Sequence, residues 1–149
     1  MAGALLAFAG EMALACDKPP KARAIEVGIA DWINSERAKK GLRQLSASSA
    51  LGKAASAHAC DMAKRGFFGH AGPGGPSFKG RLQKAGFRLS AAVENIARST
   101  KPSAETAARL WRDSLGHWAN VLNPAIDKIG VAVATDGSEV YYVFVGGAD

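Results

Sequence analysis

The sequence has 149 residues, of which 48% are hydrophobic and 21% are charged, and it carries a formal net charge of +6. This composition excludes an intrinsically disordered chain, and the length fits one domain with a single core. The Lys and Arg residues are scattered, with no dense run and no aromatic platform between them. We therefore expect a basic surface compatible with anionic neighbours, and no specific nucleic-acid site.

We interpret residues 1–15 as an N-terminal segment that is the remnant of a secretory signal. It contains an apolar run, and Ala13-Leu14-Ala15 fits the small-x-small rule for signal-peptidase cleavage. Against this interpretation, no Lys or Arg lies near its start, and Glu11 interrupts the run. The alternative is a retained segment that docks on the body as a helix. The run is too short to span a membrane, so we expect no transmembrane segment.

The chain has two cysteines, Cys16 and Cys60. An even count in an exported protein predicts one disulfide. Closing the loop between residues 16 and 60 contributes about 4 kcal/mol of stability. The alternative is that Ala13-Leu14-Ala15-Cys16 is a lipobox and that Cys16 carries lipid. That motif lacks the usual branched aliphatic residue, and it would leave Cys60 alone, so the disulfide is the favoured prediction.

Helical periodicity and capping residues predict four helices. Gly41 and Gly66 end the first two, and the glycine- and proline-rich residues 69–76 form a loop that presents His70 at a rim. The predicted helices cover residues 25–40, 46–65, 77–85 and 103–115.

The C-terminal part of the sequence is typical of a β-sheet. Residues 128–135 and 139–145 are β-branched and aromatic runs, and Asp136-Gly137-Ser138 between them predicts a hairpin. Residues 93–97 form either a short strand or an extended bend. Helices followed by a hairpin indicate an α+β domain.

Three side chains from separate segments are candidates for a functional site. His70, Glu94 and His117 each lie where a structured segment meets a glycine or a turn. If they converge, two imidazoles and a carboxylate form either a metal site or an acid–base site. His58, on an apolar helix face, is predicted to be a hydrogen-bonded core histidine. Arg81 either pairs with a carboxylate or is solvated.

Five motifs occur in order from about residue 25 to residue 147. They are Asn34-Ser35-Glu36-Arg37 with Gly41-Leu42, Ala57-His58-Ala59-Cys60-Asp61-Met62-Ala63 running into Gly69-His70, Glu94-Asn95-Ile96-Ala97, Trp111-Arg112-Asp113-Ser114-Leu115-Gly116-His117 with Asn120, and Ile129-Gly130-Val131. In these motifs the chain resembles the CAP superfamily of cysteine-rich secretory, antigen 5 and pathogenesis-related class 1 proteins, in particular its small bacterial secreted members.

The resemblance implies a three-layer α–β–α sandwich around a small antiparallel sheet, formed by residues 16–149. It also implies a central cleft with two histidines and two acidic residues. Carried over to this sequence, the histidines are His70 and His117, and one acid is Glu94. The second acid of many eukaryotic members falls on Ser114, so the chain departs from the full set of four.

Two kinds of cleft are compatible with these groups. In the first, His70 and His117 bind a divalent metal, with Zn²⁺ as the candidate cofactor, and Glu94 either completes the ligand set or orients an imidazole. The resemblance supports metal binding by the two histidines in some members. In the second, Glu94 accepts hydrogen bonds from both imidazoles and shapes the cleft without metal. Asn95 and Asn120 are predicted to support the cleft.

We therefore predict a monomeric, secreted or periplasmic CAP domain whose cleft binds a divalent metal or an unassigned ligand, which is a small molecule, a lipid or a cell-envelope component. The alternative function is a hydrolase that acts on envelope or extracellular polymers by metal-assisted or Ser-based chemistry. Ser114 lies three residues before His117, but Gly116 is expected to end the helix, and the sequence has no Gly-x-Ser-x-Gly motif. Ser-based chemistry is therefore disfavoured.

Overall fold

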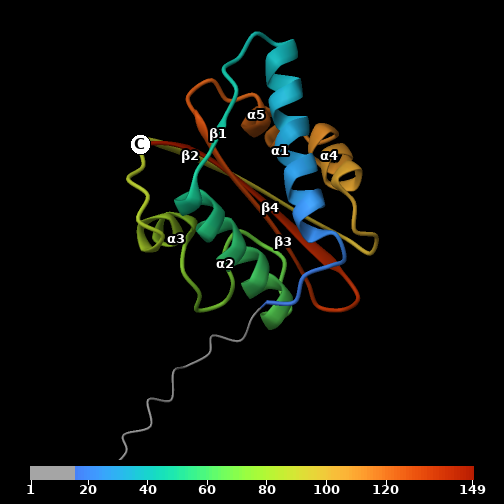
Figure 1. Ribbon diagram of the computed structural model, residues 1–149. Coiled ribbons are helices and arrows are strands. Elements are labelled where there is room, and N and C mark those ends of the chain that lie inside the picture. Colours follow the sequence, from blue (N-terminus) through green and yellow to red (C-terminus); the bar gives the residue numbers. More distant parts are fainter. Residues whose placement is uncertain (1–15) are drawn as a thin grey trace, which may run out of the picture.

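Figure 1 shows the computed structural model, which describes residues 16–149. The predicted signal remnant, residues 1–15, lies outside the described residues. No helix in the described part is long and apolar enough to cross a membrane. The helices are α1 (Ala22–Lys39), α2 (Ser49–Arg65), α3 (Phe78–Lys84), α4 (Ala104–Arg112) and α5 (Leu115–Val121), and the strands are β1 (Ser46–Ala47), β2 (Ala91–Ser99), β3 (Lys128–Thr135) and β4 (Val140–Ala148).

The strands form one sheet in the order β1-β3-β4-β2. β3 and β4 form the predicted antiparallel hairpin. β2 pairs antiparallel with β4 along its whole length, from Ala91 opposite Ala148 to Ser99 opposite Val140. The short β1 pairs with β3 in parallel, so the sheet is antiparallel except at this edge.

The prediction that the second helix begins at Ser46 is wrong. Within residues 46–65, Ser46 and Ala47 form β1, and the helix begins only after Ser48. Ser48 has an extended backbone, and its hydroxyl accepts a hydrogen bond from Leu51 N, which caps α2. Residues 46–48 therefore form a short strand and a helix cap, and helical periodicity does not distinguish these residues from the helix that follows.

Two layers of helices cover the sheet, which confirms the predicted α–β–α sandwich (Figure 1). α1, α4 and α5 cover one face, where Trp111 packs beside Phe144. α2 and α3 cover the other face, where Leu51 and Leu82 are fully buried. A Cβ atom at Gly130 would lie 2.2 Å from the backbone carbonyl carbon of Leu51, so only glycine lets α2 approach β3 this closely.

The predicted helix over residues 103–115 is two helices. α4 ends at Arg112, and Ser114 has an extended backbone and precedes α5. Gly116 therefore lies inside α5 rather than ending a helix, and His117 lies on a helix separate from α4.

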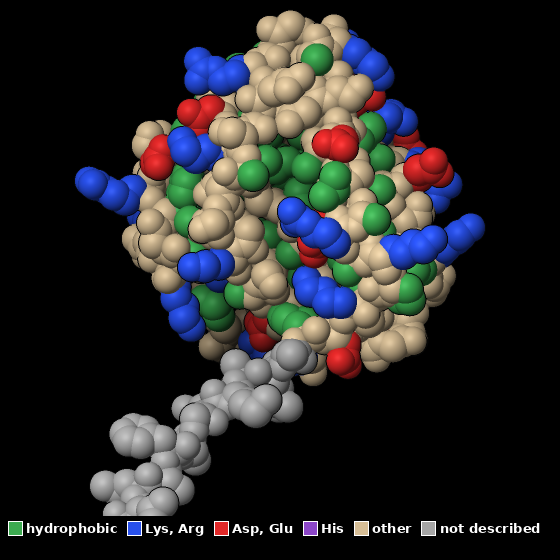
Figure 2. All heavy atoms as spheres, in the orientation of Figure 1, with side chains coloured by type: hydrophobic (Ala, Val, Ile, Leu, Met, Phe, Trp, Pro, Cys, Tyr) green, Lys and Arg blue, Asp and Glu red, His purple; other side chains and the backbone are tan. Residues whose placement is uncertain are grey.

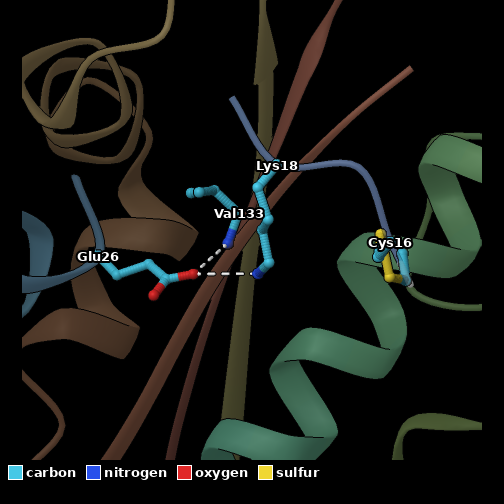
Figure 3. Close-up of a disulfide and its surroundings, with 5 residues drawn as sticks. Cys16, Lys18, Glu26 and Val133 are labelled. Atoms are coloured by element: carbon cyan, nitrogen blue, oxygen red, sulfur yellow. Dashed lines mark hydrogen bonds and ion pairs between the residues drawn. A yellow bond between two sulfur atoms is a disulfide. The ribbon is translucent and has the colours of Figure 1, made fainter. Parts of the chain in front are cut away.

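The described N-terminus is tied to both helical layers, as Figure 3 shows. The predicted disulfide is present: Cys16 and Cys60 are joined with an S–S distance of 2.03 Å. Two residues further on, Lys18 Nζ donates to Glu26 Oε1 at 3.2 Å. The same oxygen accepts a hydrogen bond from Val133 N at 3.2 Å, so α1 protects a backbone donor on the side of β3 that faces away from β4.

One buried arginine ties α1 to the segment that follows α5. Arg37 is fully buried, and its guanidinium donates to the carbonyl oxygens of Arg43, Val121, Asn123 and Ile126 at 2.7–3.3 Å. Burial lowers the pKa of this guanidinium. The last residue of the Asn-Ser-Glu-Arg motif therefore has a structural role.

Candidate functional site

The centre of the site is a buried carboxylate on β2, the strand at one edge of the sheet. Only 2% of the Glu94 side chain is exposed. Its Oε1 atom accepts a hydrogen bond from His70 Nδ1 at 2.9 Å, and its Oε2 atom accepts one from Arg81 Nη2 at 2.5 Å. A buried carboxylate is costly to leave without a cation and hydrogen bonds, so these three side chains form one unit.

The loop between α2 and α3 carries His70, and Arg81 of α3 holds this loop in place. Arg81 Nη1 donates to His70 O at 2.8 Å and to Pro76 O at 3.5 Å. The His70 side chain is 57% exposed. Because its Nδ1 atom donates to the Glu94 carboxylate, Nε2 is the unprotonated nitrogen of the neutral ring.

His58 lies under this network as a core residue. It is 1% exposed, and its Nε2 atom donates to Gly69 O at 2.7 Å, which fixes the start of the loop. Its Nε2 atom lies 3.9 Å from Glu94 Oε1. Burial lowers the pKa of His58, although the Glu94 charge opposes this shift, so the ring is neutral at neutral pH. The structure thus places His58 as a hydrogen-bonded core histidine.

Two asparagines join α5 to β2 on the other side of the sheet. Asn95 is fully buried, and its Nδ2 atom donates to His117 O at 2.9 Å. Asn120 Nδ2 donates to Asn95 Oδ1 at 2.8 Å and to Glu94 O at 3.4 Å. Both predicted supporting residues therefore link the two elements that carry Glu94 and His117.

The ring of His117 is the least satisfied part of the site. Its Nδ1 atom is buried and has no hydrogen-bond partner within residues 16–149. Burial lowers the pKa of His117, and the nearby His70 lowers it further. The ring is therefore neutral at neutral pH, and His70 is close enough to act on its pKa.

The structure does not join Ser114 to the other candidates. Ser114 is half-buried at the start of α5, and its side chain makes no capping hydrogen bond. In the described part of the chain, no hydrogen bond links its hydroxyl to His117 or Glu94, and no group of three His, Cys, Asp or Glu side chains is arranged to hold a metal ion. Within these residues the candidate donors are therefore the two imidazoles, and Glu94 is hydrogen-bonded to that of His70.

Sequence reasoning left the role of Arg81 open and missed that of Trp111. The structure assigns Arg81 to Glu94, although the two lie 13 residues apart on different elements. Trp111 Nε1 donates to Ile96 O at 3.0 Å, which anchors α4 to β2 two residues beyond Glu94. The position of Arg81 after the glycine- and proline-rich loop was the only available signal for its role, and no signal indicated the Trp111 contact.

Comparisons with known sequences identify relatives of this chain. The model of the cysteine-rich secretory protein family, CAP, matches residues 30–147. The uncharacterized protein YkwD of Bacillus subtilis is 34% identical over 128 residues, which are 86% of this chain and 49% of that protein. The chain thus spans about half the length of this relative.

Solved structures give the same result for the fold. An extracellular protein with an SCP domain from Bacillus anthracis is 26% identical, with a TM-score of 0.79, over 86% of this chain and 41% of that chain. An outer surface protein from Borrelia burgdorferi is 20% identical, with a TM-score of 0.78, over 89% of this chain and 98% of that chain. The second likeness concerns the fold alone.

Proposed function

The chain belongs to the cysteine-rich secretory protein family, CAP, and we propose that its cleft binds a divalent transition-metal ion through His70 and His117. The observation that carries this proposal is the buried Nδ1 atom of His117, which has no hydrogen-bond partner in the described structure. Leaving such a group unpaired costs on the order of 1–3 kcal/mol, and a bound ion removes this cost.

The donor set fits a metal that prefers imidazole, such as Zn²⁺. His70 already has its Nδ1 atom fixed by the Glu94 carboxylate, which is how proteins commonly orient a metal-binding imidazole. A metal-binding imidazole must be unprotonated, and the lowered pKa of His117 favours this form. The proposal therefore assigns His70 Nε2 and His117 Nδ1 as the two ligands.

Glu94 acts indirectly in this proposal. Both of its oxygens already accept hydrogen bonds, one from His70 and one from Arg81. Two protein ligands leave the other coordination positions to water or to a ligand, and a bound ion would supply Lewis acidity there. This chain's own contribution is to orient one imidazole and to keep the other neutral.

We also propose that the domain acts outside the cytoplasm, as a secreted or periplasmic protein. The Cys16–Cys60 disulfide supports this location, because disulfides persist in oxidising compartments. The Bacillus anthracis and Borrelia burgdorferi proteins are described as extracellular and outer-surface proteins, which is consistent with it. No described contact of Ser114 supports the Ser-based form of the hydrolase alternative.

Calorimetric titration of demetallated protein with Zn²⁺ tests the proposal. We expect saturable binding of one ion, weakened at least about tenfold in His70→Ala and in His117→Ala, because each variant removes one ligand. Ser114→Ala, which changes a neighbouring side chain outside the ligand set, should bind like the wild type. Absence of binding in the wild type, or equal binding in all four proteins, would show that the cleft is not a metal site.

A further inference from the structure

A concavity lies between α2 and α3, and neither His70 nor His117 lines it. It is a groove of about 650 Å³. Residues 74–76 of the loop that carries His70 close one side of it. This volume lies within the range of about 300–1,000 Å³ that is typical of small-molecule sites.

The helical repeat explains why the groove is open and largely apolar. Ala54 and Ala57 of α2 lie along one wall, and Pro76 with Ala85, the residue that ends α3, forms the other. Residues three and four positions apart share a helix face, so these short side chains leave space between the two helices. A molecule in the groove would therefore contact an apolar surface.

The rim of the groove is positively charged. Lys53 of α2 and Lys84 of α3 line it from opposite sides, and Arg65 in the same groove is paired with Asp61 at 3.1 Å. Figure 2 shows that Lys and Arg side chains are spread over the face that it draws, with apolar, neutral and some acidic side chains among them. This pattern suits one anionic group attached to an apolar body better than a dense polyanion.

Arg81 provides a second, independent indication of a ligand. It lines the groove, it is only 5% exposed, and its Nε atom has no hydrogen-bond partner within residues 16–149. Its other two nitrogens hold Glu94 and His70 O. A buried guanidinium donor left unsatisfied favours an acceptor from outside the chain.

We propose that this groove binds a small organic anion, with a carboxylate or phosphate group at Arg81, Lys53 and Lys84 and an apolar body against Ala57 and Ala85. The site is distinct from the proposed metal site, because neither His70 Nε2 nor His117 Nδ1 takes part in it. The two sites share Arg81, so an anion in the groove perturbs the surroundings of His70.

Titration of the full chain with octanoate, followed by amide and imidazole NMR signals, tests this proposal. We expect saturable shifts at Ala57 and Ala85, with a smaller shift of the His70 ring. 1-Octanol and inorganic phosphate, which each retain only half of the proposed chemistry, should bind at least about tenfold more weakly. Equal binding of 1-octanol would refute the role of the charge, and equal binding of phosphate would refute the role of the apolar walls.

Matched variants locate the site. Lys53→Gln with Lys84→Gln should weaken octanoate binding about tenfold, since each partly exposed charge contributes modestly. Lys40→Gln with Lys101→Gln removes the same net charge from exposed positions outside the groove and should leave binding unchanged. Ala57→Phe should abolish binding by filling the groove, whatever its charge. Equal loss in both double variants, or full binding by Ala57→Phe, would overturn the assignment.

Discussion

The two histidines of the candidate site are held in different ways. His70 is fixed by its ring, through Glu94, and by its carbonyl, through Arg81. Asn95 fixes the carbonyl of His117, whose Nδ1 atom has no partner among the described residues. Glu94 and Asn95 are neighbours on β2, and side chains alternate along a strand, so one strand supports the two histidines from opposite faces of the sheet. The difference is that one imidazole is oriented in advance, while the other keeps a buried ring nitrogen without a partner in the described structure.

Removal of the support under His70 should have the largest effect. Arg81→Met leaves the Glu94 carboxylate buried without its cation, and we expect the free energy of unfolding, measured in urea, to fall by about 3–5 kcal/mol. The double variant Arg81→Met, Glu94→Gln removes both charges and should recover most of this loss. A loss below about 1 kcal/mol in the single variant would mean that the pair behaves as a solvated surface pair.

Loosening of the support under His117 should cost less. Asn95→Ala removes the donor to His117 O and the partner of Asn120, so we expect a loss of about 1–3 kcal/mol in urea unfolding. Asn120→Ala, which keeps the bond between Asn95 and His117, is the control and should cost less. If Asn120→Ala costs more than Asn95→Ala, then Asn95 is not the main support of α5.

Acidification should weaken the folded state through its neutral histidines. Burial lowers the pKa of both His58 and His117 in the folded protein. Below the ordinary histidine pKa of about 6.5, the unfolded chain therefore binds more protons than the folded chain. The contribution of the two neutral histidines to the free energy of unfolding is fully present above that pH. It falls as the pH decreases, by up to about 1.4 kcal/mol per pH unit for His58 and by less for the partly exposed His117.

Urea unfolding between about pH 5 and pH 7.5 measures this dependence. His58→Gln should reduce the slope below pH 6.5, whatever its effect on stability at neutral pH. The variant keeps a polar side chain at the position that contacts Gly69 O. Stability that rises on acidification, or an unchanged slope in the variant, would contradict a neutral buried His58.

Substitution of Ser114 should have the smallest effect. Its side chain makes no capping hydrogen bond, so Ser114→Ala should change the free energy of unfolding by no more than about 0.5 kcal/mol. The same variant should leave any turnover of ester, peptide or peptidoglycan-derived substrates unchanged. Turnover that is lost in Ser114→Ala and survives a chelator would instead favour the Ser-based hydrolase.

The sequence predicted the parts of the fold that depend on local patterns. The β3–β4 hairpin follows from two β-branched runs around Asp136-Gly137-Ser138, and the family motifs predicted that His70 and Glu94 lie in one cleft. The sequence did not assign Arg81 to Glu94, because periodicity does not determine which of several carboxylates a distant cation meets. That choice depends on tertiary packing.

The errors in element boundaries also have physical causes. Ser46 and Ala47 pair with β3 only because the chain after α1 returns to that edge of the sheet, and two residues carry no periodicity of their own. The break before α5 arises at Ser114, where the sequence continues with residues that are compatible with one long helix. Both errors are therefore cases in which tertiary contacts overrode local preference.

The most direct test of the account is the ¹⁵N NMR spectrum of the three imidazoles during titration with Zn²⁺. We predict that the neutral ring of His70 carries its proton on Nδ1, and that His70 Nε2 and His117 Nδ1 shift together to metal-bound values and saturate at one ion per chain. The buried His58 ring should stay unchanged as an internal control. A response confined to the exposed His70, with His117 Nδ1 unaffected, would contradict the claim that His117 is the available partner of an oriented His70.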